Sequence, residues 1–266
     1  MQIGRKEEMA TRIEIDRLQK IRDIFHKNQY VLDDRFVIHD GKYHKCAIIC
    51  PGGGYQLVCS FVEGVPFARA LNKKGISAFI VYYRVRDKAL YPNPQDDLAR
   101  AVQEIISRKE EYMVDMEDYS VWGSSAGGHL AASFGTTKMG YPHYGLPKPS
   151  AIILAYPVIT LEEEKTHLGS RENLLGKKAS EEKALAYSIQ TNVDQNYPRT
   201  FVWCGDADEA VSPENTKKLA AALKAQGIAY EAHIYPGVPH GVGTAKGLSA
   251  EGWIDQAVEF WMKDGQ

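Results

Sequence analysis

Residues 121–129 read Val-Trp-Gly-Ser-Ser-Ala-Gly-Gly-His and contain a Gly-x-Ser-x-Gly motif centred on Ser125. β-Branched and aromatic residues before the motif predict a short buried strand, and small residues after it predict a closely packed helix. A serine at such a turn is held in strained backbone geometry, and Gly123 and Gly127 leave room for the neighbouring strand and helix. Ser124 competes with Ser125, but only Ser125 has a glycine two residues away on both sides. The motif predicts a strand–turn–helix unit with Ser125 as the candidate nucleophile.

A second glycine-rich segment, Pro-Gly-Gly-Gly-Tyr at 51–55, follows an apolar strand predicted at 46–50. Three consecutive glycines have no side chains to cover their backbone N–H groups, so these groups can approach a ligand. Beside this kind of serine turn, such a loop supplies one oxyanion donor, and the amide after the nucleophile, here Ala126, supplies another. A phosphate-binding loop is an alternative, but no Gly-Lys-Ser/Thr follows and Gly-x-Gly-x-x-Gly spacing is absent. A plain flexible turn is the other alternative.

Acyl transfer by a serine needs a base within hydrogen-bond reach and a carboxylate to orient that base. Among the eight histidines we favour His240, which lies in a Pro/Gly-rich loop at 235–243 after an alternating strand predicted at 230–235. His233 lies inside that strand and is expected to be packed or to face the surface. His129 follows the nucleophile by four residues on the same helix, so we expect it to pack beside the turn.

Three acidic residues, Asp206, Asp208 and Glu209, follow the strand predicted at 200–204 and compete for the role of the carboxylate. We choose Asp208 because it lies in mid-loop and because the Asp-x-x-Val spacing lets Val211 anchor the loop from below. Asp206 is nearer to the strand end and is expected to support the loop by local hydrogen bonds. An acidic turn without a catalytic role is the alternative.

Strand and helix patterns alternate along the chain and predict an α/β fold with a mostly parallel, doubly wound sheet flanked by helices. Strands are predicted at 30–38, 45–50, 76–83, 119–122, 151–156, 200–204 and 230–235. Helices are predicted at 63–74, 95–109, 126–134, 214–226 and 251–263. Within a main domain at 30–266, the mainly polar segment 161–195 predicts a small cap insertion. An amphipathic helix in residues 1–29 is expected to pack on this body, with a second subunit as the alternative.

Composition excludes several other classes of function. The 266 residues suffice for one domain without disulfides, and the net charge of −2 offers no footprint for nucleic acid. No apolar stretch approaches the roughly 20 residues of a membrane span, and the N-terminal residues lack the apolar core of a signal peptide. The four cysteines lack a disulfide-scaffold spacing and are expected to be free thiols in a reducing cytoplasm. Metal-ligand motifs are absent, so no metal or cofactor is expected.

Five segments together resemble the α/β-hydrolase superfamily, and in particular its bacterial acetyl-esterase and xylan-esterase-like branch. They are Pro-Gly-Gly-Gly-Tyr at 51–55, Gly-Ser-Ser-Ala-Gly-Gly-His-Leu at 123–130, Ser-Arg-Glu-Asn-Leu-Leu-Gly at 170–176, Asp-Glu-Ala-Val at 208–211 and Pro-His-Gly at 239–241. The resemblance covers residues 40–262 and places the segment at 170–176 in the cap. Many relatives carry a histidine before the glycine-rich loop, where this chain has Cys50 and Pro51. Any bracing of the loop by that histidine is therefore missing here.

The resemblance implies a catalytic triad of Ser125, Asp208 and His240. It also implies an oxyanion hole made by Gly53, Gly54 and Ala126. Candidate substrate contacts are Tyr55, Arg171 and Trp203. For each of these three residues a structural position is the alternative, because aromatic residues in this fold are often part of the core.

The activity implied by the resemblance is that of a cytoplasmic serine esterase which removes short acyl groups, acetate foremost, from sugars or oligosaccharides. The expected partner is a small-molecule or oligosaccharide ester, with no nucleic acid and no membrane, and a homo-oligomer is left open. The alternatives are an arylformamidase-like enzyme, a general short-chain carboxylesterase, and a non-catalytic binding protein on the same scaffold. The preference for sugars follows from the resemblance alone, because a fold does not determine a substrate.

Overall fold

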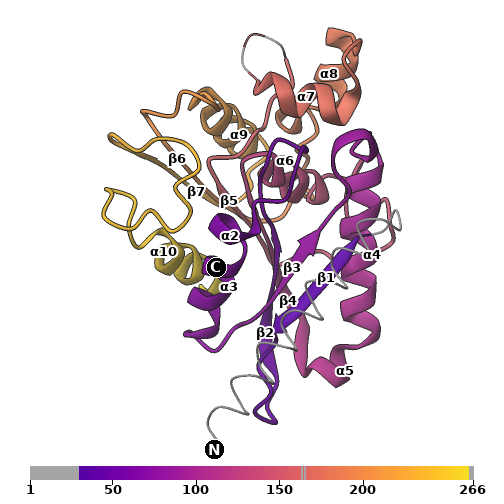
Figure 1. Cartoon of the computed structure of the whole chain (residues 1–266), viewed down its shortest axis with the longest axis vertical. Coiled ribbons are helices and arrows are strands. Elements are labelled where there is room, and N and C mark those ends of the chain that lie inside the picture. The colour runs from indigo at the N-terminus through magenta and orange to yellow at the C-terminus, as the bar shows by residue number, and fades with distance from the viewer. Residues whose placement is uncertain (1–29, 163, 165, 264–266) are drawn as a thin grey trace, which may run out of the picture.

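The computed structural model describes residues 30–162, 164 and 166–263, so the helix expected in residues 1–29 lies outside the described residues. The described chain forms one seven-stranded sheet in the order β1-β3-β2-β4-β5-β6-β7 (Figure 1). The strands are β1 (Val31–Phe36), β2 (His44–Cys50), β3 (Ser77–Tyr82), β4 (Val114–Ser124), β5 (Ala151–Ala155), β6 (Thr200–Gly205) and β7 (Tyr230–Tyr235). Only β1 runs antiparallel to its neighbour, which confirms the predicted mostly parallel sheet.

The sheet is covered on both faces, so side chains on both sides of its central strands are buried. These strands are therefore continuous apolar runs. All six residues of β3 and the last five of β2 are buried. Strand β4 begins at Val114, five residues before the predicted start at 119. The prediction missed this first part of the strand because its side chains alternate between buried and more exposed positions. Such a half-exposed segment carries a weaker apolar signal than a fully buried strand.

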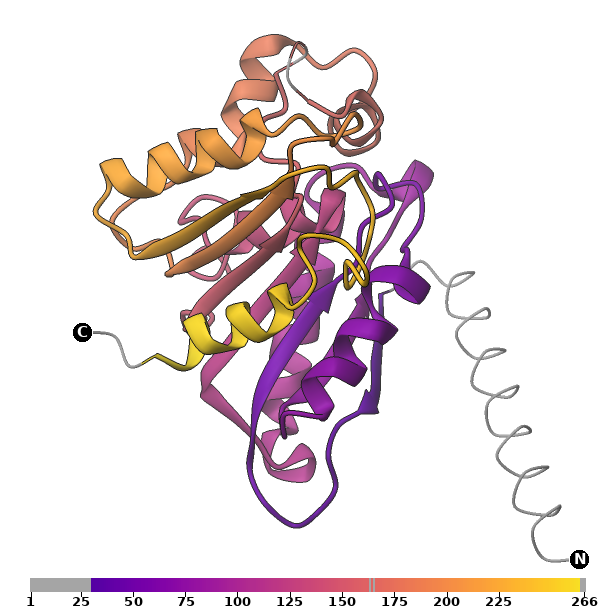
Figure 2. The ribbon, with the colours of Figure 1, turned by 90° about the vertical axis from the view of Figure 1, so that its left-hand side faces the viewer.

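Helices cover both faces of the sheet, and Figure 2 shows α9 and α10 on opposite sides of β6 and β7. One face packs against α4 (Asn93–Ser107), α6 (Ser125–Phe134) and α9 (Glu214–Ala225). The other packs against α3 (Val65–Asn72) and α10 (Trp253–Met262). Shorter helices are α2 (Ser60–Glu63), η1 (Arg86–Lys88) and α5 (Lys109–Tyr112). In the described part of the chain, no helix has both the length and the apolar character needed to cross a membrane.

Between β5 and β6 the chain leaves the sheet and forms three short helices: α7 (Leu168–Leu175), α8 (Glu181–Tyr187) and η2 (Ile189–Thr191). In Figure 1, α7 and α8 lie at the top of the molecule, beyond the carboxyl ends of the strands. They fall inside the segment 161–195 for which a cap was predicted. The loops that follow β2, β4, β6 and β7 end at the same edge, where open α/β sheets usually bind ligands.

Candidate active site

The turn from β4 to α6 holds Ser125 in a backbone conformation that a residue with a side chain rarely adopts. Its φ is 52°, in the left-handed region, and 8% of its surface is exposed. The flanking glycines permit the turn. A Cβ on Gly123 would lie 2.2 Å from the carbonyl oxygen of Gly127, and a Cβ on Gly127 would lie 2.1 Å from that of Cys50. These approaches leave no room for any other residue at either position.

Three loops from different strands bring a serine, a histidine and an aspartate into one hydrogen-bonded chain. Nε2 of His240, in the loop after β7, lies 2.9 Å from Oγ of Ser125. Nδ1 of the same ring lies 2.7 Å from Oδ2 of Asp208, in the loop after β6. The competing Ser124 is fully buried and interacts with the side chain of Tyr156 rather than with the imidazole of His240. The three residues chosen from the sequence therefore have the geometry needed for nucleophilic catalysis.

The acidic loop separates the roles of its three carboxylates. Oδ1 of Asp208 accepts the backbone N–H groups of Ala210 and Val211, at 3.0 and 2.8 Å, so the loop fixes the carboxylate while Oδ2 faces the imidazole. Asp206 instead accepts the N–H of Gly237 at 2.6 Å, so it supports the neighbouring loop after β7 rather than its own loop by local hydrogen bonds. Glu209 is exposed.

Hydrogen bonds hold the glycine-rich loop in one orientation. Tyr83 donates its hydroxyl hydrogen to the carbonyl of Pro51 at 2.6 Å, and Cys59 donates its N–H to the carbonyl of Gly52 at 2.8 Å. Because the C=O and N–H of a trans peptide point in opposite directions, the N–H of Gly53 points away from Cys59. The loop therefore has a defined shape, although no histidine directly precedes it.

The candidate oxyanion donors come from this loop and from the start of α6. Among the hydrogen bonds of the described residues, none is donated by the N–H of Gly53 or Gly54. The N–H of Ala126 lies in the first turn of α6, where such groups have no partner within the helix. Gly52 packs directly against the nucleophile, since a Cβ on it would lie 2.8 Å from Cβ of Ser125. Free amides from two segments thus occur close to the serine.

The structure does not support the three proposed substrate contacts. Tyr55 and Trp203 are completely buried, and the rings of Tyr156 and Trp253 pack against the indole of Trp203. Arg171 is 7% exposed and ties α7 to the chain on either side of it by donating to the carbonyls of Leu161 and Ala179 and pairing with Glu181. Side chains enclosed in this way have no free surface to offer to a substrate.

Sequence reasoning missed His167, which begins α7 as its N-cap. Its Nδ1 accepts the N–H of Ser170 at 3.2 Å, a role that serine, threonine, aspartate or asparagine usually fills. Its ring also contacts the glycine-rich loop: Cε1 lies 3.4 Å from the position of a Cβ on Gly54. Burial, together with the nearby charge of His240, lowers the pKa of His167. The start of α7 therefore places a second imidazole near the candidate triad.

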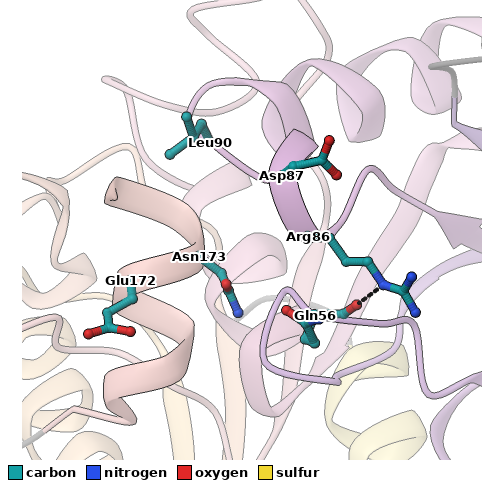
Figure 3. Close-up of a pocket in the computed structure, with 6 residues that line it drawn as sticks. All are labelled: Gln56, Arg86, Asp87, Leu90, Glu172 and Asn173. Carbon is teal, nitrogen blue, oxygen red and sulfur yellow. Dashed lines mark hydrogen bonds between the residues drawn. The ribbon is translucent and has the colours of Figure 1, made fainter. Parts of the chain in front are cut away.

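A polar hollow lies on the outer side of the glycine-rich loop, between α7 and η1 (Figure 3). Its volume is about 360 Å³, and it is lined by Gln56, Arg86, Asp87, Leu90, Glu172 and Asn173. In Figure 3 the amide of Asn173 points down toward the loop, where Nδ2 donates to the carbonyl of Gly54 at 2.8 Å. This bond joins the hollow to the loop that supplies the candidate oxyanion donors.

Comparison with known proteins identifies relatives over most of the chain. A family model described as BD-FAE matches residues 39–223. Endo-1,4-β-xylanase B of Butyrivibrio fibrisolvens is 31% identical over 227 residues, which are 82% of this chain and 35% of that protein. An acetylxylan esterase of Xylanibacter ruminicola is 28% identical over 219 residues, which are 80% of this chain and 44% of that protein. The chain thus spans less than half the length of these two relatives.

A solved structure is similar in both fold and sequence. The acetyl ester-xyloside bifunctional hydrolase from Caldicellulosiruptor lactoaceticus superposes with a TM-score of 0.78 at 32% sequence identity. The match covers 87% of this chain and 86% of that one.

Proposed function

Since this chain belongs to the BD-FAE family and has the α/β-hydrolase fold, we propose that it is a serine carboxylic-ester hydrolase. Its substrates are sugars or oligosaccharides that carry short acyl groups, acetate foremost. The observation that carries the proposal is the hydrogen-bonded chain from Ser125 through His240 to Asp208, with distances of 2.9 and 2.7 Å. A free serine hydroxyl is a poor nucleophile, and this arrangement activates it.

In the proposed acylation step, Oγ of Ser125 attacks the carbonyl carbon of the ester while Nε2 of His240 takes the hydroxyl proton. Asp208 holds the imidazole in the required tautomer and stabilises its protonated form. The negative oxygen of the tetrahedral intermediate accepts hydrogen bonds from the amides of Ala126, Gly53 and Gly54. Each such donor contributes about 3–4 kcal/mol to transition-state stabilisation.

The intermediate then collapses, and the sugar hydroxyl leaves with the proton held by His240. This leaves the acyl group bonded to Oγ of Ser125. A water molecule attacks that acyl group while His240 again acts as the base. Acetate departs and the serine regains its proton, so the cycle needs no metal or cofactor.

Two observations support the choice of substrate. Two of the similar proteins are an acetylxylan esterase and an acetyl ester-xyloside bifunctional hydrolase. Five of the six residues that line the hollow beside the glycine-rich loop are polar, and polar side chains suit the hydroxyls of a sugar. We place the sugar portion of the substrate there, with the acyl group directed toward Ser125. The four free cysteines support a reducing cytoplasm as the proposed compartment.

The test uses an activity probe and a panel of substrates. A fluorophosphonate should label the wild-type protein at Ser125 and leave Ser125→Ala unlabelled. Turnover of p-nitrophenyl esters should fall as the acyl chain lengthens beyond acetate, and mass spectrometry should show loss of acetyl groups from acetylated xylo- or manno-oligosaccharides. Faster turnover of an N-formyl aromatic amine would favour an arylformamidase instead. Equal turnover of all short esters without any oligosaccharide product would favour a general carboxylesterase, and the absence of labelling would favour a binding protein.

A further inference from the structure

A buried carboxylate outside the candidate triad connects two of the loops that form the site. Glu63, the last residue of α2, is 3% exposed. Its Oε2 accepts the N–H of Gly52 in the glycine-rich loop at 2.6 Å, and its Oε1 accepts the hydroxyl hydrogen of Tyr156 at 2.9 Å. The carboxylate therefore touches the loop next to the nucleophile on one side and a tyrosine on the other.

Tyr156 continues this connection to the loop that carries the histidine. Its hydroxyl oxygen accepts the N–H of Gly243, three residues after His240, at 3.0 Å. Its ring packs edge-on against the imidazole of His240, with ring centroids 4.9 Å apart. Trp253 secures the same loop from α10 by donating its indole N–H to the carbonyl of Gly243 at 3.0 Å. A displacement of Tyr156 would therefore move the base itself.

The backbone of Tyr156 indicates that its position is enforced. Its φ is 39°, in the left-handed region, and its N–H donates to the carbonyl of Trp203 at 2.6 Å. A residue with a side chain keeps such a conformation only where the surrounding structure holds it, and such residues cluster at functional sites. The phenol is almost fully buried, and its contacts with Glu63, Gly243 and His240 hold it from three sides.

The charge of Glu63 is suited to the reaction. Both of its oxygens act as acceptors, so these two hydrogen bonds fit the ionised form. Burial raises the pKa of Glu63, while the bonds from Gly52 and Tyr156 and the nearby His240 oppose that rise. Cys59 and Tyr83 are the other titratable groups that interact with this carboxylate. When His240 takes the proton of Ser125 it becomes positive, and a second buried carboxylate then lies close to that charge.

From these contacts we infer that Glu63 and Tyr156 are positioning residues for the candidate triad. Together they hold the glycine-rich loop and His240 at a constant separation, and the negative charge of Glu63 stabilises the protonated imidazole. This inference rests on the proposed function, because it assumes that Ser125 and His240 react.

Three variants separate position from charge. Glu63→Gln removes the charge but keeps the size, Glu63→Asp keeps the charge but shortens the reach, and Tyr156→Phe removes the hydroxyl link. Tyr197→Phe is the matched control, because Tyr197 is a buried tyrosine whose hydroxyl donates to the carbonyl of Ala132 at 2.8 Å, away from the triad. Circular dichroism and thermal unfolding establish that each variant is folded.

The readouts are turnover of p-nitrophenyl acetate and the rate of fluorophosphonate labelling of Ser125 across pH. We expect kcat and the labelling rate to fall about 10- to 100-fold in all three test variants, with KM nearly unchanged, because small displacements of a base have effects of this size. In Glu63→Gln the acid limb of both pH profiles should also move to lower pH, because a protonated His240 has lost a neighbouring negative charge. In Glu63→Asp and Tyr156→Phe the limb should stay in place, and Tyr197→Phe should match the wild type.

These outcomes also distinguish the inference from the proposed function. If the wild type is labelled and hydrolyses the ester, but Glu63→Gln and Tyr156→Phe retain wild-type rates and pH profiles, the positioning role is wrong and the esterase proposal stands. If the Tyr197→Phe control loses as much kcat as Tyr156→Phe, the effect is one of general packing and the positioning role is also wrong. If the wild type is neither labelled nor active on any ester, both proposals fail.

Discussion

The phenol of Tyr55 donates a hydrogen bond to Nδ1 of His129, 3.0 Å away, and so joins the glycine-rich loop to helix α6. On the other side of the ring, Nε2 donates to the carbonyl of Tyr187 in the cap at 3.1 Å. The carbonyl can only accept, so Nε2 carries a hydrogen, and Nδ1 of the neutral ring is then the acceptor. The ring is completely buried, and this burial lowers the pKa of His129 to about 4.

Stability should therefore fall as the pH falls from about 6.5 to about 4. Over this range the unfolded chain takes up a proton on His129 and the folded protein does not, which favours unfolding by up to about 3 kcal/mol. The measurement is urea-induced unfolding at several pH values for the wild type and for His129→Gln. Glutamine keeps one donor and one acceptor but does not titrate, so the difference between the two proteins should change across this window. If the free energies of unfolding of the two proteins change with pH by the same amount, the lowered pKa of His129 is contradicted.

Replacement of the nucleophile should abolish activity without loss of fold. In Ser125→Ala we expect kcat for p-nitrophenyl acetate to fall by about 10⁴- to 10⁶-fold, because members of a triad act as a unit. Ser124→Ala is the matched control, since Ser124 is the adjacent serine and is fully buried. Its activity and its melting temperature should stay near the wild-type values. Loss of activity in Ser124→Ala alone would reverse the assignment of the nucleophile.

The two aspartates of the acidic loop should differ sharply in their importance. Asp208→Asn directs an amide donor at Nδ1 of His240 and so favours the wrong tautomer, which should lower kcat about 10⁴-fold. Asp206→Asn can still accept the N–H of Gly237 through its amide oxygen and should keep kcat within a few-fold of the wild type. Steady-state kinetics at neutral pH decide between the two residues. Similar losses in both variants would mean that the loop is sensitive to any change of charge.

The polar hollow should matter for sugars and not for small esters. Asp87→Asn and Glu172→Gln remove charged acceptors from its lining, so KM for an acetylated xylo-oligosaccharide should rise about tenfold, as expected for loss of one charge-assisted hydrogen bond of about 1.5 kcal/mol. Neither change should alter kcat or KM for p-nitrophenyl acetate, which has no sugar to place in the hollow. If both substrates respond equally, the hollow is part of the common machinery. If neither responds, the sugar lies elsewhere.

The sequence predicted all seven strands, the main helices and the three residues that form the hydrogen-bonded chain. Buried parallel strands are continuous apolar runs, and the serine turn is a local motif whose glycines are required by direct steric contact. Asp208 and Asp206 have the same residue type, so only their positions in the loop could distinguish them. The mid-loop position of Asp208 is the one that faces His240. Apolar runs, the serine turn and the acidic loop are each formed by residues that are close in sequence, so a local pattern can reveal them.

Other features depended on contacts that no local pattern encodes. Tyr55 and Trp203 stand close in sequence to functional loops, but their side chains point into the core, and the direction of a side chain is set by tertiary packing. Glu63 occurs in a short helix with no motif, and its role becomes visible only when Gly52 and Tyr156 are seen on either side of it. For the same reason His167 could not be distinguished from a surface histidine.

The bond from Asn173 to the carbonyl of Gly54 has a practical consequence for protein engineering. Exchanging the cap for that of a related enzyme is an obvious way to alter substrate range. Because α7 holds the peptide next to the candidate oxyanion donors, a transplanted cap without an amide donor at this place would also slow the chemistry. Substrate choice and catalytic rate in this protein are therefore not independent design variables.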